Sequence, residues 1–346
     1  MRVCVALPAL LGWLFSLSVH AEVRSWTNED GKTIQAELLR LEDEGKTAVL
    51  NLKGKEYRVP RSRLSAGDQA FLDQWKPEPG SSLSPNGTVA GTVALAGTPL
   101  EAGERVKILL PLDKQERRWA EKGIKGEVGT NDEILQSEFA IAVPPGFNPE
   151  TLTPVLVVSS TSDGNASSVS HMKSYIETAN AEGYLVIAAD WDGGKPEGDG
   201  DTDGLRWAVL HAGLREMWKT WPKSREYPYA AAGFSGGAKR TFKISALLCS
   251  EKLDFRGFFL GGCNQYFGLR GMELAGNGRR LYKKAKVFVS NGESDTISTV
   301  AHAKGLMKGC KGLFDEARLE LYEDTHRLHK PHVQAALKWF LEDERR

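Results

Sequence analysis

The segment Tyr229-Ala-Ala-Ala-Gly-Phe-Ser-Gly-Gly-Ala238 decides the fold of this chain. Its first residues are small and apolar, as in a buried strand, and helical spacing begins directly after the glycine pair. Between the two lies Gly233-Phe-Ser-Gly-Gly237, a G-x-S-x-G turn that exposes a serine hydroxyl between strand and helix. Small residues on either side of the serine leave room for close packing of the strand against the helix. The segment predicts Ser235 as a nucleophile and the Gly236 amide as a donor to an oxyanion.

Short apolar runs alternate with helix-length segments on both sides of this turn. The predicted strands are 106–110, 139–143, 155–160, 185–190, 229–234, 257–260, 286–290 and 318–322. The predicted helices are 171–182, 204–219, 237–250, 299–308 and 332–342. Strands that are apolar on both sides and separated by helices indicate a mostly parallel sheet covered on both faces. We therefore expect an α/β fold in which chemistry lies beyond the carboxyl ends of the strands.

A serine nucleophile needs a histidine to accept its proton and a carboxylate to orient that histidine. Asp295 follows the predicted strand 286–290 and is the expected carboxylate, with Glu293 of the same loop as its competitor. The alternative role for Asp295 is to cap the helix that follows. His326, which comes after strand 318–322, is the expected base. Serine, acid and histidine thus occur in this chain order, each directly after a strand, which predicts a catalytic triad.

Residues 87–346 resemble an α/β-hydrolase, nearest the branch of secreted polyhydroxyalkanoate depolymerases and feruloyl or acetylxylan esterases. The likeness rests on the nucleophile segment and on Phe139-Ala-Ile-Ala-Val-Pro-Pro-Gly-Phe147, which is similar to the opening strand and turn of that branch. The resemblance implies hydrolysis of carboxylic esters, in small molecules or in polysaccharide or polyester polymers. The reaction would pass through an acyl-enzyme and would need no cofactor.

One departure from that branch concerns the second oxyanion donor. Members usually follow the early strand with His-Gly, whereas here that strand is followed by Ser159-Ser-Thr-Ser-Asp-Gly164. Alignment of the strand places the donor amide at Ser162 or Thr161. Loss of one donor typically costs about 10²–10³ in rate. A hydrolase-fold protein that binds a ligand without turning it over therefore stays an alternative, as does a serine peptidase with the same triad.

Trp191 is the second residue of the loop 190–204, which follows a predicted strand and is expected to border the cleft. An exposed indole stacks well on a sugar or phenolic ring, so Trp191 is the candidate substrate-binding side chain. The alternative is that the ring serves only in packing.

Two groups of metal-ligand residue types occur in the sequence. Zinc suits imidazole and carboxylate ligands, but no established zinc motif is matched by the spacing of Asp324, His326, His329 and His332. The start of a calcium loop is matched by Asp199, Asp201, Asp203 and Gly204. Leu210 stands where an EF-hand has a bidentate glutamate, so a solvated loop that caps the next helix is favoured. We predict no metal site.

Residues 22–76 form a separate block of short strands, such as 47–52 and 56–59, and end in a helical turn with Ser65 as its N-cap. The block resembles the Sla-homology type of SH3-like domain through Arg24-x-Trp-Thr27, Gly31, Gly45, Val59-Pro60, Leu64-Ser65 and Asp68-Gln69. That resemblance implies attachment to a protein or cell-surface partner rather than chemistry. Proline, glycine and serine then mark residues 77–86 as a linker.

The first residues read as an export signal. An arginine precedes an apolar stretch from Val3 to Val19, and cleavage is expected after Ala21, so residues 1–21 form the predicted signal peptide. A membrane anchor is disfavoured because the stretch is short for a span of about 20 residues and contains Pro8. We expect a secreted or periplasmic protein with no membrane span after removal of the signal.

Composition adds two limits. The 45 Lys and Arg residues balance 45 Asp and Glu residues, which disfavours a nucleic-acid partner. Removal of the signal leaves three cysteines, too few for a disulfide scaffold. Cys249 falls on the apolar side of helix 237–250 and is expected to be buried and unpaired, whereas pairing of Cys263 with Cys310 stays open.

Overall fold

The computed structural model describes residues 23–28, 32–42, 45–52, 55–74, 93–124, 136–161, 166–191 and 201–342. The chain divides into two compact units, Met1–Ala90 and Gly91–Arg346. The predicted signal peptide and the predicted linker 77–86 lie outside the described residues. Among the helices of the described ranges, none combines the length and the apolar character that a bilayer crossing requires.

The first unit contains a four-stranded antiparallel sheet in the order β1-β2-β3-β4. Its elements are β1 (Val23–Thr27), β2 (Thr33–Glu42), β3 (Thr47–Leu52), β4 (Lys55–Pro60) and the helix α1 (Ala66–Gln74). Trp26, Leu50 and Leu72 belong to its small buried core. Ser65 caps α1 as predicted, because its hydroxyl accepts the amide of Asp68 at 3.2 Å. The small N-terminal β-sheet is confirmed, while the SH3-like assignment stays a prediction.

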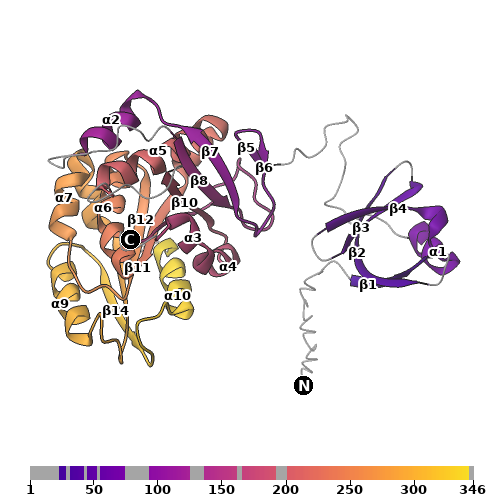
Figure 1. The fold of residues 1–346 in the computed structure, drawn as a ribbon. Coiled ribbons are helices and arrows are strands. Elements are labelled where there is room, and N and C mark those ends of the chain that lie inside the picture. Colours follow the sequence, from indigo (N-terminus) through magenta and orange to yellow (C-terminus); the bar gives the residue numbers. More distant parts are fainter. Residues whose placement is uncertain are drawn as a thin grey trace, which may run out of the picture. The chain divides into compact units, whose positions relative to one another are not determined.

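The second unit is built on an eight-stranded sheet in the order β14-β13-β12-β11-β9-β10-β8-β7 (Figure 1). The strands are β7 (Val106–Pro111), β8 (Gln136–Ala142), β9 (Val155–Ser159), β10 (Leu185–Trp191), β11 (Pro228–Phe234), β12 (Asp254–Gly261), β13 (Lys286–Gly292) and β14 (Ala317–Tyr322). All eight overlap the predicted strands. Only β8 runs antiparallel to its neighbours, β7 and β10. The predicted fold class, an α/β fold with a mostly parallel sheet, is therefore confirmed.

Helices cover both faces of this sheet (Figure 1). The helices are α2 (Lys114–Lys122), α3 (Ser168–His171), α4 (Lys173–Ala181), α5 (Asp203–Thr220), α6 (Gly236–Ser250), α7 (Gly268–Ala275), α8 (Arg279–Lys284), α9 (Val300–Lys311) and α10 (Lys330–Leu341). Successive side chains of a strand point to opposite faces. Ala231 of β11 accordingly belongs to the core shared with α5 and α6, whereas Ala230 and Ala232 belong to the core shared with α4 and α10.

Three helices and a hairpin went unpredicted: α2, α7, α8 and the pair β5 (Ala94–Leu95) with β6 (Thr98–Pro99). Glycines interrupt the apolar spacing of α7, so its pattern does not stand out from a loop. One of them, Gly271, is required by packing, because a Cβ there would lie 2.1 Å from the Tyr282 hydroxyl oxygen.

The three cysteines of the described chain are free thiols. Cys249 is fully buried, as predicted, and Cys263 and Cys310 are equally buried without a disulfide between them. Burial raises the pKa of the Cys263 thiol to about 11. The stability of this unit therefore rests on its packed core.

Candidate active site

The turn between β11 and α6 holds Ser235 in a strained backbone conformation. Its φ of 55° lies in the region that residues other than glycine rarely adopt. Such strain costs about 1–3 kcal/mol and persists only where the surroundings impose it. Close packing imposes it here, because a Cβ on Gly233 would lie 2.3 Å from the Gly237 carbonyl carbon and one on Gly237 would lie 2.4 Å from the Ser159 oxygen. The elbow predicted from the sequence is present.

The elbow is also tied to the next strand of the sheet. The Ser235 amide donates to the Gly261 carbonyl at the end of β12 over 2.8 Å. The Ser235 side chain does not cap α6, although the residue holds the N-cap position. The hydroxyl is therefore not consumed in holding the helix together.

His326 and Asp295 are in direct contact. His326 Nδ1 lies 2.6 Å from Asp295 Oδ2, and the carboxyl group is almost fully buried. The other oxygen, Oδ1, accepts the amides of Ile297 at 2.8 Å and Ser298 at 2.7 Å. These bonds fix the orientation of the carboxylate, with Oδ2 directed to the histidine. The alternative role of Asp295 as a helix cap does not apply, because Thr299 is the N-cap of α9.

The imidazole of His326 lies beside the elbow. Its ring centroid is 4.7 Å from that of Phe234, the residue directly before Ser235. A Cβ on Gly262, which follows the strand that binds the Ser235 amide, would lie 2.9 Å from His326 Cε1. Phe234 is the unspecified position of the G-x-S-x-G turn, so the sequence motif could not reveal its contact with the histidine. The structure thus brings the three predicted triad residues to one edge of the sheet.

The rival candidates for the acid and for a metal site have other surroundings. Glu293 is exposed, and its amide donates to the Tyr322 carbonyl. His329 stacks on the Tyr322 ring at 4.5 Å, and His332 Nδ1 lies 2.9 Å from Ser290 Oγ. Burial lowers the pKa of His332, and the neighbouring His329 adds to that effect. Within the described residues no three such groups converge on a point where a metal ion could bind.

Thr161, one of the two predicted oxyanion donors, packs directly against the elbow. A Cβ on Gly236 would lie 2.0 Å from Thr161 Oγ1, so the loop after β9 and the start of α6 are in contact. Ser162, the other candidate, lies outside the described residues. The Gly236 and Thr161 backbones are therefore neighbours, as the predicted pair of donors requires.

Trp191 lies at the end of β10 and packs against the main core. The guanidinium of Arg206 covers its ring at 4.4 Å, so one face of the indole is already occupied. A substrate contact for Trp191 stays a prediction.

In the segment that resembles the start of a calcium loop, the described aspartates pair with basic side chains. Asp201 accepts from Arg206 and Arg240, and Asp203 accepts from Lys243 at 2.8 Å. Asp199 lies outside the described residues. Thr202 caps α5, which agrees with the interpretation of this segment as a helix-capping loop.

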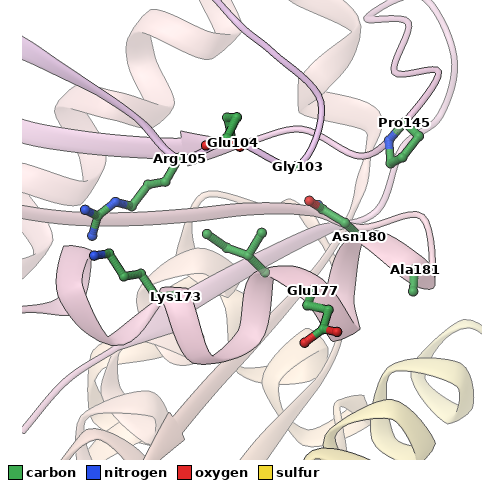
Figure 2. A pocket seen from close by; sticks show the side chains of 9 residues that line it. Gly103, Glu104, Arg105, Pro145, Lys173, Glu177, Asn180 and Ala181 are labelled. Carbon is green, nitrogen blue, oxygen red and sulfur yellow. The ribbon is translucent and has the colours of Figure 1, made fainter. Parts of the chain in front are cut away.

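A surface pocket of about 600 Å³ lies elsewhere, along α4 (Figure 2). It is lined by Gly103, Glu104, Arg105, Pro145, Lys173, Ile176, Glu177, Asn180 and Ala181. None of these residues belongs to the predicted triad. Of its two acidic residues, Glu177 is paired with Lys330 at 2.7 Å, and Arg105 donates to the Val169 carbonyl.

Comparison with known proteins gives likenesses among solved structures. No protein-family model matches the chain, and no curated protein matches it in sequence. An α/β serine hydrolase homologue from Coxiella burnetii is 15% identical with a TM-score of 0.45, over 71% of this chain and 100% of that chain. An α/β serine hydrolase without a lid from Xanthomonas campestris is 15% identical with a TM-score of 0.44, over 70% and 96% of the two chains. Est1E from Butyrivibrio proteoclasticus, with ferulic acid bound, is 14% identical with a TM-score of 0.43, over 61% and 95%. At these identities the likeness concerns the fold alone.

Proposed function

We propose that this chain is a secreted serine hydrolase that cleaves carboxylic esters through an acyl-enzyme. The observation that carries the proposal is the contact of His326 with Asp295 beside the strained elbow of Ser235. Strain and a buried carboxylate both cost stability, and they are typical of sites where geometry serves chemistry. Further support comes from the chain order of Ser235, Asp295 and His326, which is the order typical of the hydrolase fold.

The chemistry follows from the ring nitrogens of His326. Asp295 holds Nδ1 as a donor, so Nε2 is the nitrogen that takes the proton of the Ser235 hydroxyl. The serine oxygen attacks the ester carbonyl carbon, and the amides of Gly236 and of Thr161 or Ser162 hold the resulting oxyanion. The imidazolium then protonates the leaving alcohol as the carbon–oxygen bond breaks. Water, deprotonated by the same histidine, repeats the sequence on the acyl-enzyme and releases the acid.

The choice of an ester rests on the resemblance of residues 87–346, since a triad does not encode which acyl bond is cut. Polysaccharide or polyester substrates are included in the proposal. A serine peptidase would use the same residues. Residues 22–76 are proposed to attach the enzyme to a protein or cell-surface partner outside the cytoplasm.

A second candidate function is a binding protein with the hydrolase fold. The observation that favours it is the loop Ser159–Gly164, which replaces the His-Gly of the branch that the chain resembles. Such a protein would bind an ester and release it unchanged.

One experiment separates these functions. The chain from Glu22 onward is purified and incubated with a fluorophosphonate probe and with short-chain nitrophenyl, feruloyl and peptide substrates. We expect labelling and ester hydrolysis, both lost in Ser235→Ala and both retained in Ser170→Ala, a matched change at an exposed serine of α3. Equal labelling of wild type and Ser235→Ala would refute the proposal, and cleavage of peptides alone would identify a peptidase.

A further inference from the structure

Next to the loop after β9, which holds the predicted oxyanion donor Thr161, lies a buried carboxylate that the catalytic scheme does not use. Asp190, near the end of β10, accepts the amides of Ser168 at 3.1 Å and Val169 at 3.0 Å, and also the hydroxyl of Ser167. These three donors form the start of the short helix α3. The carboxylate therefore fixes the point at which the chain leaves the loop after β9.

Ser168 passes this restraint to the other end of the same loop. Its hydroxyl oxygen accepts the amide of Ser160 at 3.1 Å, and the two hydroxyl oxygens lie 3.2 Å apart. Ser160 is fully buried and directly precedes Thr161, which packs against Gly236. A continuous path of hydrogen bonds and packing thus runs from Asp190 to the backbone beside the nucleophile.

The buried Arg206 binds the Asp190 end of this path and is joined through Asp201 to a second buried arginine, Arg240. Arg206 donates from Nη1 to Asp190 at 2.5 Å and from Nε to Asp201 at 2.6 Å. Arg240, on the helix that begins at Gly236, lies 3.2 Å from the other oxygen of Asp201. Burial opposes ionisation of Asp201, but the hydrogen bonds and charges of the two arginines outweigh it, so its pKa lies below the usual value.

The energetics of this network favour a positioning role. Buried ion pairs give little net stability compared with apolar side chains of the same volume, because desolvation offsets the attraction. In some proteins such groups instead define a geometry, and oxyanion donors are most effective when their positions are fixed before the charge develops. A rigid network directly behind the predicted donor loop provides this condition.

We propose that Asp190 and Ser168 are positioning residues, which hold the Ser160–Thr161 backbone against Gly236 so that the oxyanion hole is preorganised. The inference rests on the proposed serine hydrolase function and adds residues that the triad does not contain. Neither residue touches the reacting atoms. Both act through Ser160 on the donor amide.

The test is Ser168→Ala, which removes the hydroxyl that accepts the Ser160 amide. Complete loss of one donor costs about 10²–10³ in rate, so a displaced donor should lower kcat by about 10-fold or more. KM should stay within about two-fold, since the oxyanion forms only after binding. The second-order rate constant of fluorophosphonate labelling at Ser235 should fall in parallel. Ser170→Ala, two residues further on and exposed, is the matched control and should match wild type in every rate.

A merely structural role gives a different result. It would lower the melting temperature and the folded fraction, but the rate constants per titrated active site would stay at the wild-type value. Asp190→Asn serves as a second variant, and in the double variant the losses in kcat should be non-additive, because both changes break one path. Wild-type rate constants per active site in both single variants would overturn this inference but leave the proposed function standing. Absence of labelling in the wild-type chain would instead overturn the proposed function, and the inference with it.

Discussion

Replacement of Asp295 by asparagine is the sharpest perturbation of the proposed triad. The side chain keeps its size, and its remaining oxygen can still accept the amides of Ile297 and Ser298, now at 2.8 and 2.7 Å. The new NH₂ group faces His326 Nδ1 in place of the oxygen at 2.6 Å. The loop should therefore keep its shape while the contact with the histidine changes from acceptor to donor.

The expected loss of activity follows from the tautomer of His326. A donor opposite Nδ1 favours the imidazole with its proton on Nε2, and that nitrogen can no longer take the serine proton. In serine protease triads the same change lowers kcat by about 10⁴-fold. At about 1.36 kcal/mol for each factor of ten, this corresponds to about 5.4 kcal/mol of transition-state stabilisation. We expect a loss of this size in kcat, with KM little changed.

The assay is steady-state hydrolysis of a nitrophenyl ester with active sites titrated by a fluorophosphonate. Glu293→Gln is the matched control, because it makes the same chemical change at the competing carboxylate two residues away. It should leave kcat within about two-fold, since Glu293 is exposed. A loss of less than 10-fold in Asp295→Asn, or an equal loss in Glu293→Gln, would show that the carboxylate does not orient the histidine.

Three further predictions concern stability and reactivity. Gly257→Ala should lower the free energy of unfolding by about 1–3 kcal/mol in urea titrations, because its Cβ would lie 2.5 Å from Phe340 Cδ1. Gly305 lies in α9, where an added Cβ would have no neighbour within 4 Å, so Gly305→Ala should instead raise the free energy of unfolding by about 0.5–1 kcal/mol. A more stable Gly257→Ala than Gly305→Ala would contradict the packing argument. Cys263 should resist a disulfide exchange reagent until the chain unfolds, because the thiol is buried and its pKa is raised to about 11; rapid reaction of native protein would exclude this. Because the pKa of His332 is lowered in the folded protein, the unfolded chain binds a proton at this residue more readily. The neutral His332 side chain therefore contributes its full stabilisation above pH 6.5, the ordinary pKa, and this stabilisation is lost as the pH falls through the pKa of the folded state. Melting temperatures of His332→Gln and wild type should converge at acidic pH, and a constant difference would refute the assignment.

Much of the fold and of the site could be predicted because both depend on local patterns. Buried parallel strands are continuous apolar runs, and a G-x-S-x-G turn needs its flanking strand and helix nearby in sequence. The carboxylate and histidine that contact each other could be singled out because each directly follows a strand. Glu293 could be set aside only from the structure, since both carboxylates share one loop and their burial decides between them.

The features that escaped prediction depend on contacts across the sheet. Asp190 directly precedes Trp191 in the sequence, and its chain position does not show that it binds the start of α3. Arg206 lies in a helix pattern like any surface arginine, although it is buried between two aspartates. These paired residues belong to different segments, which come together only when the sheet has folded.

The unusual backbone of Ser235 ties the proposed nucleophile to the folded state of the chain. At a φ of 55° this residue would relax to an ordinary conformation in any chain whose glycines were not already pressed against β9 and α6. In a partly folded chain the serine hydroxyl is then an ordinary alcohol without an activating histidine or oxyanion donors beside it. Under the proposed function, reactivity toward a fluorophosphonate probe therefore requires the folded turn, so labelling would report the assembled site and not the mere presence of the chain.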